Sequence, residues 1–157
     1  MMQFDGDITA VTAGIICHIA DNDGLMIERN SKRIGNQWPL VKSEYLSMYI
    51  DSDLMLGEVI FTNVVPNDFN LQVATMICEN TNNTELDGRR ASKLDYQALR
   101  KCVRKISIWQ ETCVDGKLPV YVPHGVGCAD MMGDWRIVRT IFERRIPDMI
   151  VIRESKL

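Results

Sequence analysis

The chain has 157 residues, of which 46% are hydrophobic and 25% are charged, and its formal net charge is -3. This length and composition are typical of one globular domain, which we expect to span residues 1–157. The acidic balance argues against general nucleic-acid binding, since proteins of that class carry a basic surplus. No apolar run approaches the roughly 20 residues of a membrane-spanning helix, so we expect no membrane partner.

The cysteines point to a reducing compartment. Five cysteines occur without a C-x-x-C pair, and only two histidines accompany them, so a zinc site is not expected. Residues 1–7 show no basic region followed by an apolar run, which predicts that no signal peptide is present. We therefore expect reduced thiols, a cytoplasmic location, and no metal or cofactor.

The first half of the chain predicts strands and one divided helix. Residues 1–4 are a candidate strand, and Gly14–Ala20 is nearly all apolar, as expected for a strand covered on both faces. Ser31–Tyr49 is predicted to be helical in part and divided at Pro39, because proline breaks a helix interior but is tolerated in a first turn. Two β-rich runs follow, at residues 56–65 and 70–78.

The second half continues the alternation of strands and helices. Residues 80–93 are polar and contain Gly88, which predicts a mobile loop. From about Asp95 to Cys113, apolar residues recur at the spacing of one helix face, and the basic residues beside them predict a solvated surface. A strand at 118–122, a helix at 134–145 and a strand at 149–152 complete the chain. This order predicts an α/β fold with a central sheet and helices on both faces.

Two loops leave predicted strands where ligands usually bind in open α/β sheets, at the carboxyl ends of the strands. They are Asp21–Gly24 and Pro123–Gly133. The second loop precedes the helix predicted from Asp134, so its N–H groups and that helix N-terminus can cradle a phosphate, although a plain glycine turn explains it equally well. The first loop is not a calcium loop, because Lys32 stands where the bidentate glutamate belongs. The chain also lacks a G-x-x-x-x-G-K-[ST] phosphate loop.

Few side chains near these loops are suited to catalysis. His18 lies within a buried strand, where a packed histidine is expected, whereas His124 lies at a strand end and suits a functional role as well as a structural one. Cys128 is predicted to be a small buried residue rather than a nucleophile. Asp21 and Asp23 can either activate water or form the Asx turn that ends the strand.

Five segments, in order along the chain, resemble motifs of the macro domain family, whose members bind ADP-ribose. The similarity is to small single-domain members, phage proteins included, that act on ADP-ribose 1''-phosphate or on ADP-ribosylated proteins. The corresponding family motifs are G-D-I/L-T, I-I-C-H-x-V/A-N, the third-strand entry, Y-x-A-L-R and P-R-I-G-C-G-L-A-G-G-D-W. They match Gly6–Thr9, Ile15–Asp21, Leu56–Val59, Asp95–Arg100 and Pro123–Trp135, respectively.

The resemblance implies a three-layer α/β/α sandwich around a mixed sheet, which binds ADP-ribose or a related adenine nucleotide. Asp7 would accept the adenine amino group, the loop after Ala20 would face the distal ribose, and the loop Gly125–Gly133 would wrap the diphosphate. The implied ligand-binding residues are Asp7, Ile8, Ala20, Asp21, Met26, Arg29, Pro123, Gly125, Val126, Gly127, Cys128 and Ala129. The candidate catalytic residues are Asp21, Asp23, His124 and Asp130.

The chain departs from the family at the first loop. The family continues M-G-x-G there, whereas this chain has Ile27 and Arg29 in place of the two glycines. A side chain where the backbone must touch a phosphate removes both space and φ freedom, so we expect Arg29 to supply a charge-assisted phosphate contact instead.

Three functions are compatible with these features. The chain can hydrolyse ADP-ribose 1''-phosphate or an ADP-ribosyl linkage, which in some members joins the ligand to a protein partner. It can bind the nucleotide without catalysis, as a reader or sponge. It can also use a degenerate macro fold for protein contacts.

Overall fold

The computed structural model describes residues 1–84, 90–112, 116–129 and 131–154. Its elements, in chain order, are β1 (Met2–Gly6), η1 (Ile8–Ala10), β2 (Gly14–Asp21), α1 (Arg29–Gln37), α2 (Pro39–Asp51), β3 (Val59–Val65), β4 (Asp68–Thr84), β5 (Arg90–Leu94), α3 (Tyr96–Glu111), β6 (Val120–Pro123), α4 (Trp135–Arg145) and β7 (Ile150–Glu154). No helix in these ranges is long and apolar enough to cross a membrane.

The sheet is mixed, with a parallel centre. Its strand order is β1-β7-β6-β2-β4-β3, and β5 pairs with β4 beyond this path. All neighbours from β1 to β4 run parallel, whereas β3 and β5 each pair antiparallel with β4. Because β1, β2, β6 and β7 run the same way, their carboxyl ends meet at one edge of the sheet.

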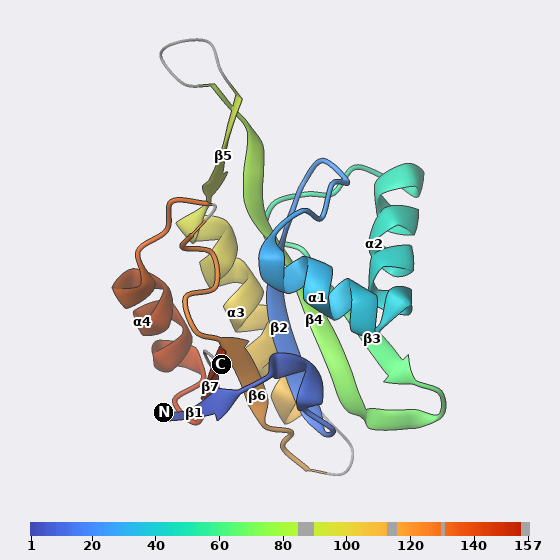
Figure 1. Cartoon of the computed structure of the whole chain (residues 1–157), viewed down its shortest axis with the longest axis vertical. Helices are drawn as coiled ribbons and strands as arrows, with labels where there is room; N and C mark the ends of the chain where they lie inside the picture. The colour runs from blue at the N-terminus through green and yellow to red at the C-terminus, as the bar shows by residue number, and fades with distance from the viewer. Residues whose placement is uncertain (85–89, 113–115, 130, 155–157) are drawn as a thin grey trace.

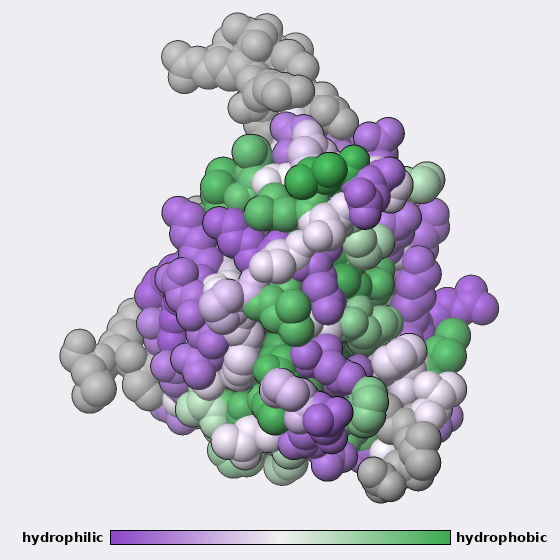
Figure 2. All heavy atoms as spheres, turned by 90° about the vertical axis from the view of Figure 1, so that its right-hand side faces the viewer, coloured by the Kyte–Doolittle hydropathy of each residue, from purple (hydrophilic) through white to green (hydrophobic). Residues whose placement is uncertain are grey.

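The helices cover both faces of the sheet, which confirms the predicted three-layer α/β/α sandwich (Figure 1). Successive side chains of β2 point to opposite faces. Ile15 and Ile19 pack in the core with α3 and α4, while Ile16 packs in a second core with α1 and α2. Over α2, apolar and polar side chains are mixed on the molecular surface (Figure 2). The fully buried β2 therefore fixes the middle of the molecule and delivers Asp21 to the edge.

The predicted division at Pro39 is confirmed. Here α1 ends at Gln37 and α2 begins with proline in its first turn, where its missing N–H is not needed. However, α1 begins at Arg29 rather than Ser31, because the side chain of Glu28 caps it by accepting the N–H of Ser31. This two-residue extension places Arg29 and its neighbours at the edge where the strands end.

The prediction of a loop over residues 80–93 is wrong at both ends. β4 continues to Thr84, and β5 returns from Arg90, forming a hairpin that extends away from the sandwich (Figure 1). Its residues lack an apolar alternation because the hairpin leaves the core, so periodicity gave no strand signal there. Residues 85–89 of the predicted loop, and Cys113 at the end of the predicted third helix, lie outside the described residues.

Candidate functional site

A cleft of about 300 Å³ lies at the edge where the parallel strands β1, β2, β6 and β7 end. One wall is the beginning of α1, and the opposite wall is the loop after β6. The ends of β1 and β7 contribute the remaining side. The lining residues are Gly6, Ile8, Glu28, Arg29, Asn30, Arg33, Pro123, His124, Gly125, Ala129, Ile152 and Glu154.

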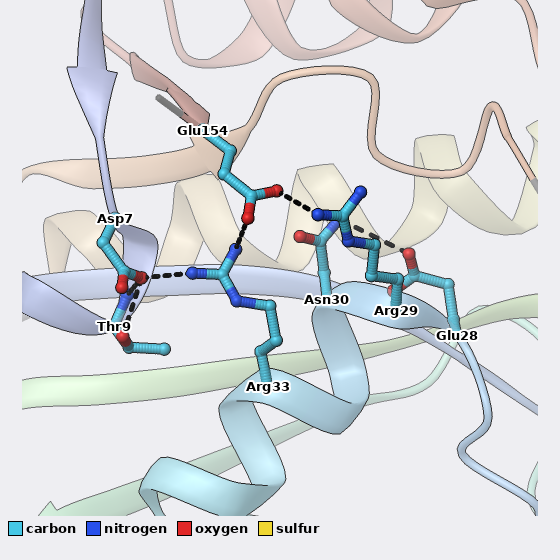
Figure 3. A network of polar contacts seen from close by, with 7 residues as sticks. All are labelled: Asp7, Thr9, Glu28, Arg29, Asn30, Arg33 and Glu154. Carbon is cyan, nitrogen blue, oxygen red and sulfur yellow. Dashed lines mark hydrogen bonds and ion pairs between the residues drawn. The ribbon is translucent and has the colours of Figure 1, made fainter. Parts of the chain in front are cut away.

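A chain of ion pairs crosses this cleft (Figure 3). Arg33 lies 2.6 Å from Asp7 and 3.4 Å from one carboxylate oxygen of Glu154. The other oxygen of Glu154 lies 2.7 Å from Arg29. Arg29 and Arg33 are four residues apart, so they project from the same side of α1 toward Glu154. The result is a pair of guanidinium groups inside the cleft, held together by a carboxylate from β7.

Asp7 forms one end of this chain. Asp7 follows β1 and caps the short 3-10 turn η1. Its Oδ1 accepts hydrogen bonds from the N–H and hydroxyl groups of Thr9. These hydrogen bonds, together with the charge of Arg33, lower the pKa of Asp7 below its usual value. Asp7 is therefore an ionised acceptor at neutral pH.

Asp21 is an internal part of the first wall. Its carboxylate is fully buried, and accepts the backbone N–H groups of Asp23, Leu25 and Met26 at 2.7–3.0 Å and the hydroxyl of Tyr45 at 2.9 Å. Met26 has φ 49, a left-handed conformation that is unfavourable for a residue with a side chain, and its bond to Asp21 holds it there. Asp21 thus holds the loop shape and does not line the cleft.

Glu28 completes the first wall. It is buried, and one carboxylate oxygen accepts the N–H of Ser31 at 3.0 Å. Ser31 in turn donates to the carbonyl of Ile19 and contacts the buried imidazole of His18, which also contacts Thr75. Burial lowers the pKa of His18 to about 3, so it is the neutral core histidine that the sequence predicts. In the first wall, two carboxylates thus accept the N–H groups of Asp23, Leu25, Met26 and Ser31.

The second wall, the loop after β6, is a glycine turn that leaves two backbone N–H groups unpaired among the described residues. Gly125 and Gly127 have φ 75 and 78, and each shapes a turn, closed by bonds from Val126 to Pro123 and from Cys128 to Gly125. The N–H groups of Gly125 and Ala129, two cleft-lining residues, have no acceptor in the part of the chain that the structure describes. Such unpaired N–H groups at a glycine turn are the usual backbone contacts of an anion.

His124 and Cys128 differ in their access to the cleft. His124 is exposed and packs against Trp135 in a tilted arrangement, with ring centroids 4.9 Å apart and an angle of 49° between the ring planes. Partial burial and the nearby Arg153 and Arg139 lower its pKa, so its imidazole is neutral at pH 7. Burial raises the pKa of Cys128 to about 11, which keeps its thiol protonated, as the sequence prediction of an unreactive cysteine requires.

The structure thus separates the residues that the sequence predicts for the site. Ile8, Arg29, Pro123, His124, Gly125 and Ala129 line the cleft. Ala20, Asp21, Met26, Val126 and Gly127 are buried beneath it, Cys128 is partly buried, and Asp23 lies off the cleft. Asp130 lies outside the described residues. Within the described ranges, no three His, Cys, Asp or Glu side chains are grouped to hold a metal ion.

Arg33 and Glu154 are the cleft residues that sequence reasoning missed. Arg33 carries a signal in retrospect, because it follows Arg29 by one helical turn. Glu154 carries none, since its contact with Arg29 joins positions 125 residues apart.

The sequence matches no known protein family and no curated protein. Solved structures do match. A protein of unknown function from Bacteroides thetaiotaomicron has a TM-score of 0.81 at 22% identity, over 98% of this chain and 97% of that one. A macrodomain protein from Streptomyces coelicolor has a TM-score of 0.73 at 21% identity, over 99% of both chains. The chain has the macrodomain fold.

The same macrodomain fold occurs in a structure that contains a nucleotide. Thermosipho africanus DarTG, solved in complex with ADP-ribose, matches with a TM-score of 0.72 at 13% identity, over 98% of this chain and 42% of that one. The macrodomain architecture inferred from the order of the sequence motifs is therefore confirmed.

Proposed function

We propose that this macrodomain binds ADP-ribose, or a related adenine nucleotide, in the cleft between α1 and the loop after β6. One observation carries the proposal: the guanidinium groups of Arg29 and Arg33 line the same cleft as the glycine turn at Gly125. Guanidinium groups and unpaired backbone N–H groups are both good phosphate ligands. The ADP-ribose complex of a protein with the same fold supports this choice of ligand.

The cleft residues suit the two ends of such a ligand differently. The N–H groups of Gly125 and Ala129 and the side chain of Arg29 would contact the diphosphate. Asp7 would accept the adenine amino group through Oδ2, which has no partner among the described residues, since its contacts with Thr9 and Arg33 all use Oδ1. The Asp7 carboxylate is ionised, and an ionised carboxylate only accepts hydrogen bonds, so it selects an amino group.

The proposal is binding rather than hydrolysis. Of the predicted catalytic residues, Asp21 holds the first wall together and Asp23 lies off the cleft. His124 does line the cleft, and its neutral imidazole can accept a proton. Incubation with ADP-ribose 1''-phosphate distinguishes the two functions: release of phosphate that is lost in His124→Ala would show a hydrolase, and no release is expected.

Calorimetric titration with ADP-ribose tests the proposal. The wild-type chain is expected to bind, and Arg29→Ala to bind about 5- to 20-fold more weakly, because one charge-assisted phosphate contact is lost. Arg104→Ala is the matched control, since Arg104 is also exposed on a helix but lies on α3, outside the cleft. Absence of heat at millimolar ADP-ribose, or equal weakening by both substitutions, would contradict the proposal.

A further inference from the structure

The carboxylate of Glu154 lies between the two arginines in the way that a bound anion would. One of its oxygens is 2.7 Å from Arg29, and the other is 3.4 Å from Arg33 (Figure 3). Glu154 itself lines the cleft, at the end of β7. A phosphate group presents oxygens to paired guanidinium groups in the same bridging arrangement.

Four N–H groups of the first wall already have carboxylate acceptors and are not available to an anion. The N–H groups of Asp23, Leu25 and Met26 are bound to Asp21, and the N–H of Ser31 is bound to Glu28. The buried carboxyl group of Glu28 also occupies the beginning of α1, where an anion would otherwise be favoured. Among the cleft-lining residues, Arg29 and Arg33 are the basic side chains that a phosphate can contact.

We propose that Glu154 occupies an anion subsite formed by Arg29 and Arg33, and that a ligand phosphate enters this subsite by displacing the Glu154 carboxylate. Only the assignment of that phosphate to ADP-ribose rests on the proposed function. The subsite itself rests on the three side chains.

The exposure of the three side chains fits such an exchange. The Glu154 side chain is 46% exposed, so it can turn into solvent without burying an unpaired charge. Arg33 is only 27% exposed and keeps its 2.6 Å contact with Asp7 when Glu154 leaves. The Arg29 side chain is 70% exposed and pairs with Glu154, so it can turn to pair with a phosphate that replaces the Glu154 carboxylate. Glu154 therefore lowers the affinity of the cleft for anions without being needed to build it.

The test compares two substitutions that remove one negative charge each. Glu154→Gln empties the subsite, whereas Asp5→Asn breaks the 3.4 Å pair between Asp5 and Arg153 on the adjacent strands, outside the cleft. Inorganic pyrophosphate and ADP-ribose are titrated into each by calorimetry at low salt. Glu154→Gln is expected to bind both probes about three- to tenfold more tightly than the wild type, and Asp5→Asn to match the wild type.

A second substitution tests whether the gain in anion affinity depends on Arg29. Arg29→Ala in the Glu154→Gln background is expected to abolish the tighter binding, and raising the salt concentration is expected to shrink it, because exposed charges are screened. Equal or weaker pyrophosphate binding by Glu154→Gln, or an equal gain in Asp5→Asn, would overturn the inference. If Glu154→Gln gains affinity for pyrophosphate but neither chain binds ADP-ribose, the subsite stands and the proposed function fails.

Discussion

The two walls of the cleft differ in whether their backbone N–H groups already have acceptors. In the first wall, Asp21 accepts the N–H groups of Asp23, Leu25 and Met26, and Glu28 accepts that of Ser31. The loop after β6 leaves the N–H groups of Gly125 and Ala129 without an acceptor in the described part of the chain. The second wall therefore offers a ligand these N–H groups, whereas the first wall offers the guanidinium groups of Arg29 and Arg33.

This difference bears on the two residues of the first wall that replace the glycines of the macro domain motif. Ile27 and Arg29 stand where the resembling family has glycines, and both side chains are exposed. The change removes a wall that can lie against a phosphate and replaces it with a guanidinium group that reaches into the cleft. Under the proposed binding, the loss of glycines changes the kind of anion contact, from backbone to side chain.

The largest expected effect comes from the buried carboxylate of the first wall. Asp21→Ala leaves three backbone N–H groups and the hydroxyl of Tyr45 without their acceptor, and we expect it to lower the free energy of unfolding by about 3 to 4 kcal/mol. Urea unfolding followed by circular dichroism measures the change.

Asp23→Ala is the matched control for Asp21, because it lies two residues away and is only partly buried. It is expected to change the free energy of unfolding by about 0.5 kcal/mol or less. If Asp21→Ala were as stable as Asp23→Ala but could not bind or turn over the nucleotide, Asp21 would belong to the ligand site and the contrast between the walls would be wrong.

A smaller effect is expected in the second wall. Gly125→Ala and Gly116→Ala each place a side chain at positive φ, with no atom within 4 Å of the new methyl group, so both should destabilise the fold by about 1 kcal/mol. Of these two glycines, Gly125 lines the cleft and Gly116 does not. Calorimetry should show about tenfold weaker ADP-ribose binding for Gly125→Ala, because relief of the strain moves the N–H groups, and unchanged binding for Gly116→Ala. Equal affinities would remove the turn from the site.

Much of this fold could be predicted from local sequence signals. The apolar run of β2, the division at Pro39 and the helical period of α3 each reflect burial or backbone chemistry within a few residues. The far part of the β4–β5 hairpin could not be predicted in the same way, because residues 80–84 and 90–93 pair with each other without an apolar alternation in their sequence.

The candidate site shows the same difference between features set by local sequence and features set by distant contacts. Loops at the carboxyl ends of strands predicted where the cleft lies, and the glycine turn predicted its second wall. The roles within the first wall depended on contacts that sequence does not encode locally. Asp21 is fixed by its own loop and by Tyr45, 24 residues away, and Glu154 reaches Arg29 across 125 residues.

The contrast between the walls is tested most directly by amide resonances during titration with ADP-ribose. In ¹H–¹⁵N spectra, we expect the largest shifts at the backbone amides of Gly125 and Ala129 and at the side-chain Nε–H of Arg29. The amides of Asp23, Leu25 and Met26 should barely move, because they remain bound to Asp21. Large shifts at those three amides, with none at Gly125 and Ala129, would contradict the account.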